Sequence, residues 1–318
     1  MSTFVKTSRD TRDLVLAVVD IGTNTLKFTV AACRRDDTIT SIAERAETVR
    51  IGAGIEATGR IDDGRAARAI SALRAFEAIA TDAGAVSLTG VATEALRLAT
   101  NGGDFLARIT AGTRWHVKVI SGDEEARLTF VGLRPMLPAS GRSCIVDIGG
   151  GSTEWIAAEN AEIVTSQSIP LGSGRLADRL FATDPPGDDA LERARHAATT
   201  SLDQYLHAGE NACSTLLLSG GNGQFLERLR AHLGIGSALD RSSIDDVLAY
   251  LARTPAWQVA GILDIAEERA RVFPAGVAVA AAVADRLAPT TIMAVPSGIR
   301  TGLLLEKARE IFDTMTPS

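Results

Sequence analysis

Cysteine is scarce in this chain of 318 residues, which holds only Cys33, Cys144 and Cys213. The three lie far apart in the sequence and form no C-x-x-C pair, so neither a zinc site nor a disulfide framework is indicated. Free thiols of this kind are typical of proteins in a reducing compartment. We therefore expect a cytoplasmic location.

Long apolar runs are also missing. No stretch approaches the roughly 18 consecutive apolar residues of a membrane-spanning helix, and residues 1–13 lack the apolar core of a signal peptide. We expect residues 1–13 to form a disordered leader. A membrane partner is not expected.

Positive charge is in deficit, with 33 Lys and Arg against 39 Asp and Glu, a net charge of −6 and a pI near 5.4. General nucleic-acid binders need a basic field over a broad face. No nucleic-acid partner is therefore expected, and any anionic ligand must be met by local groups.

Several familiar catalytic motifs are absent. The chain has no G-x-x-x-x-G-K-[ST], which excludes a P-loop, and S-G-G-N-G at 219–223 lacks the spacing of a dinucleotide fingerprint. Ser173 lies in L-G-S-G-R, whose flanks do not fit G-x-S-x-G, and the four histidines offer it no partner. Covalent serine catalysis is not expected.

What the chain does contain is ample core material, with 46% hydrophobic residues, and an internal repeat. Residues 18–30 read V-V-D-I-G-T-N-T-L-K-F-T-V, and residues 145–157 read I-V-D-I-G-G-G-S-T-E-W-I-A. In each copy an apolar run enters a turn containing glycine and a second run leaves it, which predicts a β-hairpin with a polar tip. Two such hairpins predict two similar domains.

Between and after the hairpins the pattern alternates strand and helix, which predicts an α/β fold. Pro135 and Pro138 mark the best boundary, so we predict domain I over 14–138 and domain II over 139–318, with the final helix packing back on domain I. The expected helices cover 61–83, 94–109, 123–133, 188–208, 223–233, 243–286 and 297–312. The expected further strands cover 86–93, 116–120, 162–169, 214–219 and 291–295.

The two hairpin tips have the composition of a phosphate and metal site. D-I-G-T-N-T (20–25) and D-I-G-G-G-S-T-E (147–154) each set a carboxylate at a strand end, followed by glycine and hydroxyl residues. Glycine lets backbone N–H groups approach an anion, and a nearby carboxylate can hold Mg²⁺ through water. The alternative is an ordinary turn in which each Asp satisfies its own backbone.

A third group of polar residues follows two predicted strands. Arg97 and Asn101 lie four apart on one expected helix, and Glu124 and Glu125 begin another. Arginine suits phosphate oxygens, and residues that follow a buried strand commonly face a ligand. The alternative for the two glutamates is stabilisation of the helix dipole in a first turn.

Taken together, six segments resemble the exopolyphosphatase and guanosine-pentaphosphate phosphohydrolase family. They are DIGTNT, VATEALRLATN, ISGDEEARL, VDIGGGSTE, IPLGSGRL and PSGIRTGLL, in this order. The resemblance spans residues 14 to 312. It implies two ribonuclease-H-like domains of the actin, hexokinase and acetate kinase superfamily, with a cleft between them.

The resemblance also implies roles for individual residues. Glu125 would orient or deprotonate the attacking water, with Glu124 as the alternative, and Arg97 would face the terminal phosphate. Asp147 and Glu154 would place Mg²⁺. The residues expected to cradle phosphates are Asn24, Thr25, Lys27, Gly149, Gly150, Gly151 and Ser152.

The implied function is Mg²⁺-dependent release of orthophosphate from polyphosphate or from guanosine pentaphosphate (pppGpp). The chain lacks the C-terminal helical domains of longer family members, so a long polyphosphate channel is not expected, and Thr301 stands where Glu is common in the family. Two alternatives stay open: a kinase or ATPase of the same superfamily with an adenosine pocket near 219–223, and a non-catalytic alarmone sensor. A homodimer also stays open.

Overall fold

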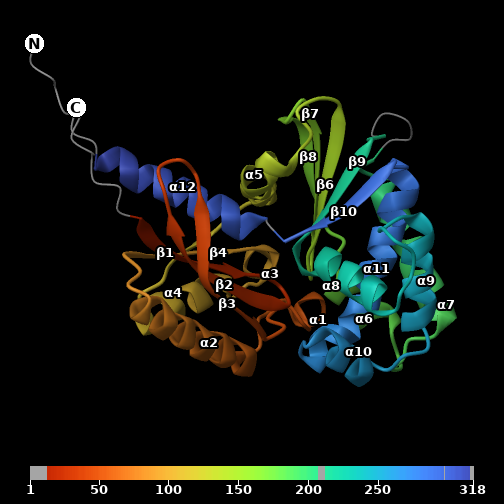
Figure 1. The fold of residues 1–318 in the computed structure, drawn as a ribbon. Helices are drawn as coiled ribbons and strands as arrows, with labels where there is room; N and C mark the ends of the chain where they lie inside the picture. Colours follow the sequence, from red (N-terminus) through yellow and green to blue (C-terminus); the bar gives the residue numbers. More distant parts are fainter. Residues whose placement is uncertain (1–12, 207–211, 297, 316–318) are drawn as a thin grey trace, which may run out of the picture.

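A computed structural model describes residues 13–206, 212–296 and 298–315 of the chain. It contains two mixed β-sheets, each flanked by helices, with the two halves of the sequence side by side (Figure 1). The predicted leader lies outside the described residues apart from Asp13. No helix in the described ranges has the length and apolar character needed to cross a bilayer.

The first sheet is built on the predicted hairpin. β1 (Leu14–Ile21) and β2 (Thr25–Cys33) pair antiparallel, β3 (Ile39–Thr48) continues the meander, and β4 (Ser87–Ala92) and β5 (His116–Val119) join in parallel. The strand order is β3-β2-β1-β4-β5. β1 and β2 are almost wholly buried, which explains why apolar residues predominate in both.

The second sheet repeats this plan. β6 (Arg142–Ile148), β7 (Thr153–Glu159) and β8 (Glu162–Ile169) form an antiparallel meander, and β9 (Thr215–Ser219) and β10 (Thr291–Val295) add parallel strands. The order β10-β9-β6-β7-β8 matches the first sheet strand for strand. The repeat in the sequence is therefore a repeat of topology, and the predicted α/β fold with two ribonuclease-H-like domains is confirmed.

Helices cover both faces of the first sheet. α2 (Asp63–Asp82) and α4 (Gly102–Gly112) pack on one face through Leu73, Phe105 and Ile109. α2 begins after Asp62, whose side chain accepts a hydrogen bond from the Arg65 amide. The last helix, α12 (Ile299–Thr314), returns from the second sheet to cover the other face.

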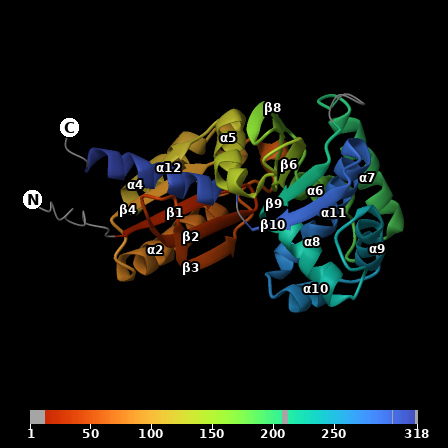
Figure 2. The same ribbon diagram turned by 45° about the horizontal axis from the view of Figure 1, so that its top comes forward.

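α5 (Gly122–Leu133) links the two halves of the molecule. It lies against α12 (Figures 1 and 2), and its Leu128 joins the core that α12 closes on the first sheet. On its other side Ala126, Phe130 and Leu133 pack with residues of the second sheet. The first turn of α5, which carries Glu124 and Glu125, is thus held between the sheets. A short 3₁₀ helix, η1 (Arg134–Met136), follows it.

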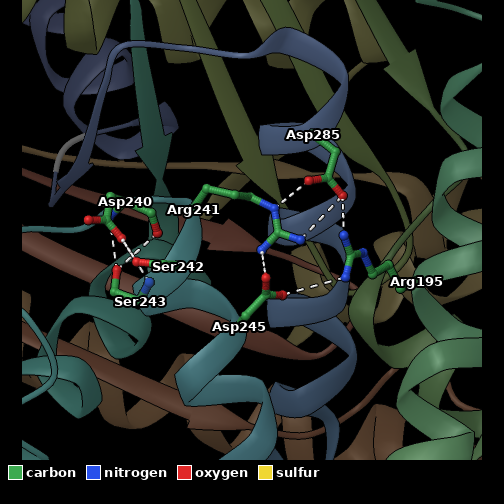
Figure 3. Close-up of polar contacts among 7 residues, drawn as sticks. All are labelled: Arg195, Asp240, Arg241, Ser242, Ser243, Asp245 and Asp285. Carbon is green, nitrogen blue, oxygen red and sulfur yellow. Dashed lines mark hydrogen bonds and ion pairs between the residues drawn. The ribbon is translucent and has the colours of Figure 1, made fainter.

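The second sheet carries a larger helical layer. Its helices are α6 (Ser173–Leu180), α7 (Asp188–Leu202), α8 (Gly220–His232), α9 (Arg241–Leu251), α10 (Ala256–Leu263) and α11 (Glu267–Leu287). α11 is buried along most of its length and is rich in Ala and Val, as expected of a helix surrounded by others. Ion pairs of Arg195 and Arg241 with Asp245 and Asp285 join α7, α9 and α11 at their surface (Figure 3).

Three local expectations need correction. The helix expected over 94–109 is broken into α3 (Glu94–Leu98) and α4, because Ala99 takes an extended conformation after α3. The expected helical stretch 243–286 is three helices, separated near Pro255 and at Asp264, which has a positive φ. α7 ends at Leu202, and the end of the helix expected to 208 falls outside the described residues. β3, α1 (Ile55–Thr58) and α6 were not expected.

Candidate active site

The tips of the two hairpins face each other across the interdomain cleft. In the first tip the Gly22 amide donates to the Thr25 carbonyl at 3.3 Å, and in the second the Gly149 amide donates to the Ser152 carbonyl at 2.9 Å. The tips touch, because a Cβ placed on Gly150 would lie 2.5 Å from the Asn24 side chain. A ligand between the tips would therefore meet both domains at once.

Most of the residues predicted from the sequence line this central cleft. They are Asn24, Thr25, Lys27, Glu125, Asp147, Gly149, Gly150, Gly151, Ser152 and Glu154. The same cleft opens into a wider cavity of about 990 Å³ bordered by β3, α8 and the start of α12. The structure thus brings the two motifs and the start of α5 into one place.

Arg97 lies beside the central cleft and not on its wall. Its Nη1 donates to Glu125 Oε2 at 3.1 Å and to the Ile120 carbonyl at 2.7 Å. Asn101, four residues later, is bonded to the backbone of Ile61 and lines neither the central cleft nor the wider cavity. The prediction that Arg97 and Asn101 share one helix face is therefore wrong, because the chain breaks between α3 and α4.

Glu125 and Glu124 lie in different surroundings although they are adjacent. Burial raises the pKa of Glu125 well above its usual range, the charges of Glu154 and Asp20 raise it further, and Arg97 opposes them. Glu124 instead forms an ion pair with Arg127 at 2.9 Å, and this contact lowers its pKa. A carboxylate that is poised to take a proton needs a raised pKa, which Glu125 has.

The second tip carries two carboxylates. Glu154 is 2% exposed and accepts hydrogen bonds from Ser152 Oγ at 2.7 Å and Ser168 Oγ at 2.9 Å. Burial, assisted by the charge of Asp147, raises the pKa of Glu154 to about 8. Asp147 is half-buried and accepts a hydrogen bond from Ser219 Oγ at 3.3 Å.

Asp20 completes the acidic group from the first tip. It is 7% exposed, and its Oδ1 has no hydrogen-bond partner within the part of the chain that the structure describes. Burial raises its pKa, Lys27 opposes the shift and Asp147 adds to it. An unsatisfied buried oxygen next to like charges is the environment that a bound cation relieves.

The residues fit Mg²⁺ only if the substrate helps to bind it. Among the described residues no group of three or more His, Cys, Asp or Glu side chains is arranged to hold a metal ion. Mg²⁺, however, is usually bound through one or two carboxylates, several waters and substrate phosphates, all of them oxygen ligands. Asp147 and Glu154, with the unsatisfied oxygen of Asp20 nearby, meet that smaller requirement.

Sequence reasoning did not identify Arg269 on α11 as a site residue. Its Nη1 crosses the cleft to donate to Thr25 Oγ1 at 2.6 Å, and its guanidinium lies 4.8 Å from the centre of the Phe225 ring. Burial lowers its pKa to about 10. Asn222 was also missed as a site residue, and its amide bonds the Ile148 carbonyl at 2.6 Å. Arg269 stands in no Gly-rich motif and in a chain rich in arginine, so only the fold could single it out.

Comparison with known proteins agrees with this geometry. Residues 29–311 match the family model described as the Ppx/GppA phosphatase family. The chain belongs to this family. It is 30% identical over 303 residues to Exopolyphosphatase 1 of Mycobacterium leprae, covering 92% of this chain and 89% of that one.

Solved structures show the same fold. A crystal structure of an exopolyphosphatase from Cytophaga hutchinsonii superimposes with a TM-score of 0.80 at 22% identity, covering 93% of this chain and 98% of that one. The Ppx/GppA family member of Aquifex aeolicus gives a TM-score of 0.74 at 23% identity, covering 94% and 98%. The predicted resemblance and the actin-like fold are confirmed, as is the enzyme class: this is a phosphatase-family hydrolase.

Proposed function

We propose that the protein is a Mg²⁺-dependent exopolyphosphatase, which hydrolyses the terminal phosphoanhydride of inorganic polyphosphate and releases orthophosphate. The observation that carries this proposal is the position of Glu125. Glu125, whose pKa is raised, lies at the start of α5 in the wall of a cleft between two phosphate-type turns, apart from the carboxylates that belong to the turns themselves. The name of the Mycobacterium leprae relative supports the choice of substrate.

The proposed reaction needs little covalent work from the protein. A water held by Glu125 attacks the terminal phosphorus while Glu125 accepts its proton, and the bond from that phosphorus to the bridging oxygen breaks. The products are orthophosphate and a chain shortened by one phosphate. Arg97, bonded to Glu125, fixes the orientation of the base. Its contact with the terminal phosphate stays a prediction.

The two tips would hold the phosphates. Backbone N–H groups of Gly150, Gly151 and Ser152 would approach from one side, and Asn24, Thr25 and Lys27 would approach from the other, while the Gly149 N–H is taken up by the turn. Mg²⁺ held by Asp147 and Glu154 would neutralise charge on the phosphoryl oxygens. Because these donors recognise phosphate groups, pppGpp is a second candidate substrate, and the wider cavity beside the tips offers room for its nucleoside.

A phosphate-release assay tests the proposal. Release would be followed with polyphosphates of several lengths, pppGpp and ATP, with Mg²⁺ and after chelation, using Glu125→Gln as the inactive control. We expect Mg²⁺-dependent release from polyphosphate, and short chains should be used at least as well as long ones. Tight binding of alarmone without release would favour the sensor, and release from ATP alone would favour an ATPase. Cytoplasmic location and a homodimer stay predictions.

A further inference from the structure

Ion pairs connect the two domains on the side of the hairpin tips that faces α1 and α6 (Figure 1). Arg175 of α6 reaches Glu56 of α1 at 3.0 Å and Glu94 of α3 at 3.1 Å. Beside them Arg50, which follows β3, pairs with Asp178 of α6. Each pair has one member on either side of the cleft, so opening the cleft on this side would separate all of them.

Glu94 is the member that reaches the hairpin tips. It is 7% exposed, and a Cβ placed on Gly151 would overlap its carboxylate. The same imagined Cβ would lie 2.8 Å from Thr23 Oγ1, so Glu94, the first tip and the second tip meet at one point. Glu94 also begins α3, the helix whose Arg97 holds Glu125. A movement of Glu94 would therefore displace both tips and, through Arg97, the base Glu125.

Arg175 is held as firmly on the opposite domain. Besides its two carboxylate partners it donates from Nη1 to the Pro170 carbonyl at 3.1 Å, and its side chain is 18% exposed. A guanidinium with several fixed acceptors has a defined orientation, because its donors form a rigid fork. Separation from Glu94 would leave a buried carboxylate without its cation, which is costly.

We propose that Glu94 and Arg175 form an interdomain clasp that sets the spacing of the two phosphate-binding tips. Both are positioning residues: they act through Gly151, Thr23 and Arg97. The effect on the reaction rests on the proposed function, whereas the effect on domain spacing does not. The ion pairs of Arg195, Arg241, Asp245 and Asp285 differ in this respect, because they lie wholly within the second domain (Figure 3).

Distance measurements on the full chain test the clasp. Spin labels would be placed at two exposed positions, Asp104→Cys on α4 and Asp246→Cys on α9, since the native cysteines are buried. Arg175→Gln should lengthen and broaden the distance distribution, and Arg175→Lys should restore part of it. Arg195→Gln, the control within one domain, should leave the distribution unchanged.

Kinetics and a variant of the partner residue supply independent readouts. Because a displacement of about 1 Å can cost up to 10²-fold in rate, Arg175→Gln should lower kcat by about tenfold. Glu94→Gln removes the charge of the carboxylate and keeps the shape of the side chain, so it should lengthen the distance in the same way; this measurement remains informative if Arg175→Gln fails to fold. An unchanged distribution in folded Arg175→Gln or in folded Glu94→Gln would overturn the clasp. A changed distribution in a protein that hydrolyses no polyphosphate would uphold the clasp and refute the proposed function.

Discussion

The two hairpin tips share a topology but differ in what they offer a ligand. The first, from Asp20 to Thr25, has one glycine and presents side chains, above all Asn24. The second, from Asp147 to Glu154, has three consecutive glycines and presents backbone. The difference makes them fit together, because Asn24 occupies space that a side chain at Gly150 would need. A repeated fold element has thus become two complementary halves of one site.

The carboxylates at the two strand ends differ as well. Asp20 is buried with one unsatisfied oxygen, while Asp147 is half-buried, bonded to Ser219 and open to both parts of the cleft. The second tip also adds the carboxylate of Glu154, where the first hairpin has Lys27. This contrast predicts that the metal is held mainly by the second tip.

The largest effect should come from the base that lies between the tips. Glu125→Gln keeps the shape of the side chain but cannot accept a proton, so turnover should fall by roughly 10² or more while substrate binding is nearly unchanged. Glu124→Gln is the matched control, because Glu124 is bonded to Arg127. Single-turnover phosphate release measures both. Near wild-type turnover in Glu125→Gln would remove the base from the mechanism.

The next largest effect is on the Mg²⁺ requirement, and it distinguishes Asp147 from Asp20. Asp147→Asn should raise the Mg²⁺ concentration needed for half-maximal activity by about tenfold or more, since metal sites respond on this scale to loss of a supporting carboxylate. Asp20→Asn should change it less, because burial already disfavours the charge of Asp20. Mg²⁺ titrations of phosphate release measure both. An equal response of the two variants would show that the tips share the metal equally.

A smaller effect compares glycines of the two tips. Alanine at Gly151 would collide with Glu94, so Gly151→Ala should push the tips apart and lower turnover by about tenfold. Alanine at Gly22 would meet the Thr25 carbonyl at 3.1 Å, a contact that a small shift relieves, so its loss should be smaller. Steady-state kinetics decide this. Equal losses of turnover in the two variants would contradict the view that only the second tip needs its glycines for close contact with the other domain.

Much of this site could be predicted from the sequence because its parts are local. The glycines, hydroxyls and carboxylates of each tip lie within eight residues of one another, and the repeat showed that two such tips exist. β3 escaped prediction because most of its residues are exposed and polar, which leaves no clear alternation. Its position follows from the pairing with β2.

Arg269 and Glu94 could not be found in the same way. Each reaches the tips from a different helix, and each contact joins the two domains. Nothing in the surrounding sequence distinguishes Arg269 from the other arginines of the chain. The packing of the two domains decides which charged side chains turn into the cleft. A single sequence, read without knowledge of which distant residues are in contact, does not contain that information.

The smallest effect is on the pH dependence of stability, and it again distinguishes the second tip from the first. The pKa of Glu154 is raised to about 8 in the folded protein, above its usual 4.5, so the folded state binds an extra proton between these values. The stability from neutral Glu154 is therefore present below about pH 4.5 and is lost as pH rises through about 8. Without Mg²⁺, the melting temperature should fall over this window.

Mg²⁺ should oppose that fall, because it binds the ionised carboxylates and stabilises the folded protein by mass action. Its effect on the melting temperature, of about 2–4 °C, should therefore be larger at pH 8.5 than at pH 5.5. Glu154→Gln should flatten the pH dependence and reduce the Mg²⁺ response, whereas Asp20→Asn should leave the loss near pH 8 in place. Thermal unfolding of the three proteins across pH, with and without Mg²⁺, measures this. If Asp20→Asn alone removed the Mg²⁺ response, the cation would be bound by the first tip, contrary to the prediction that the second tip holds it.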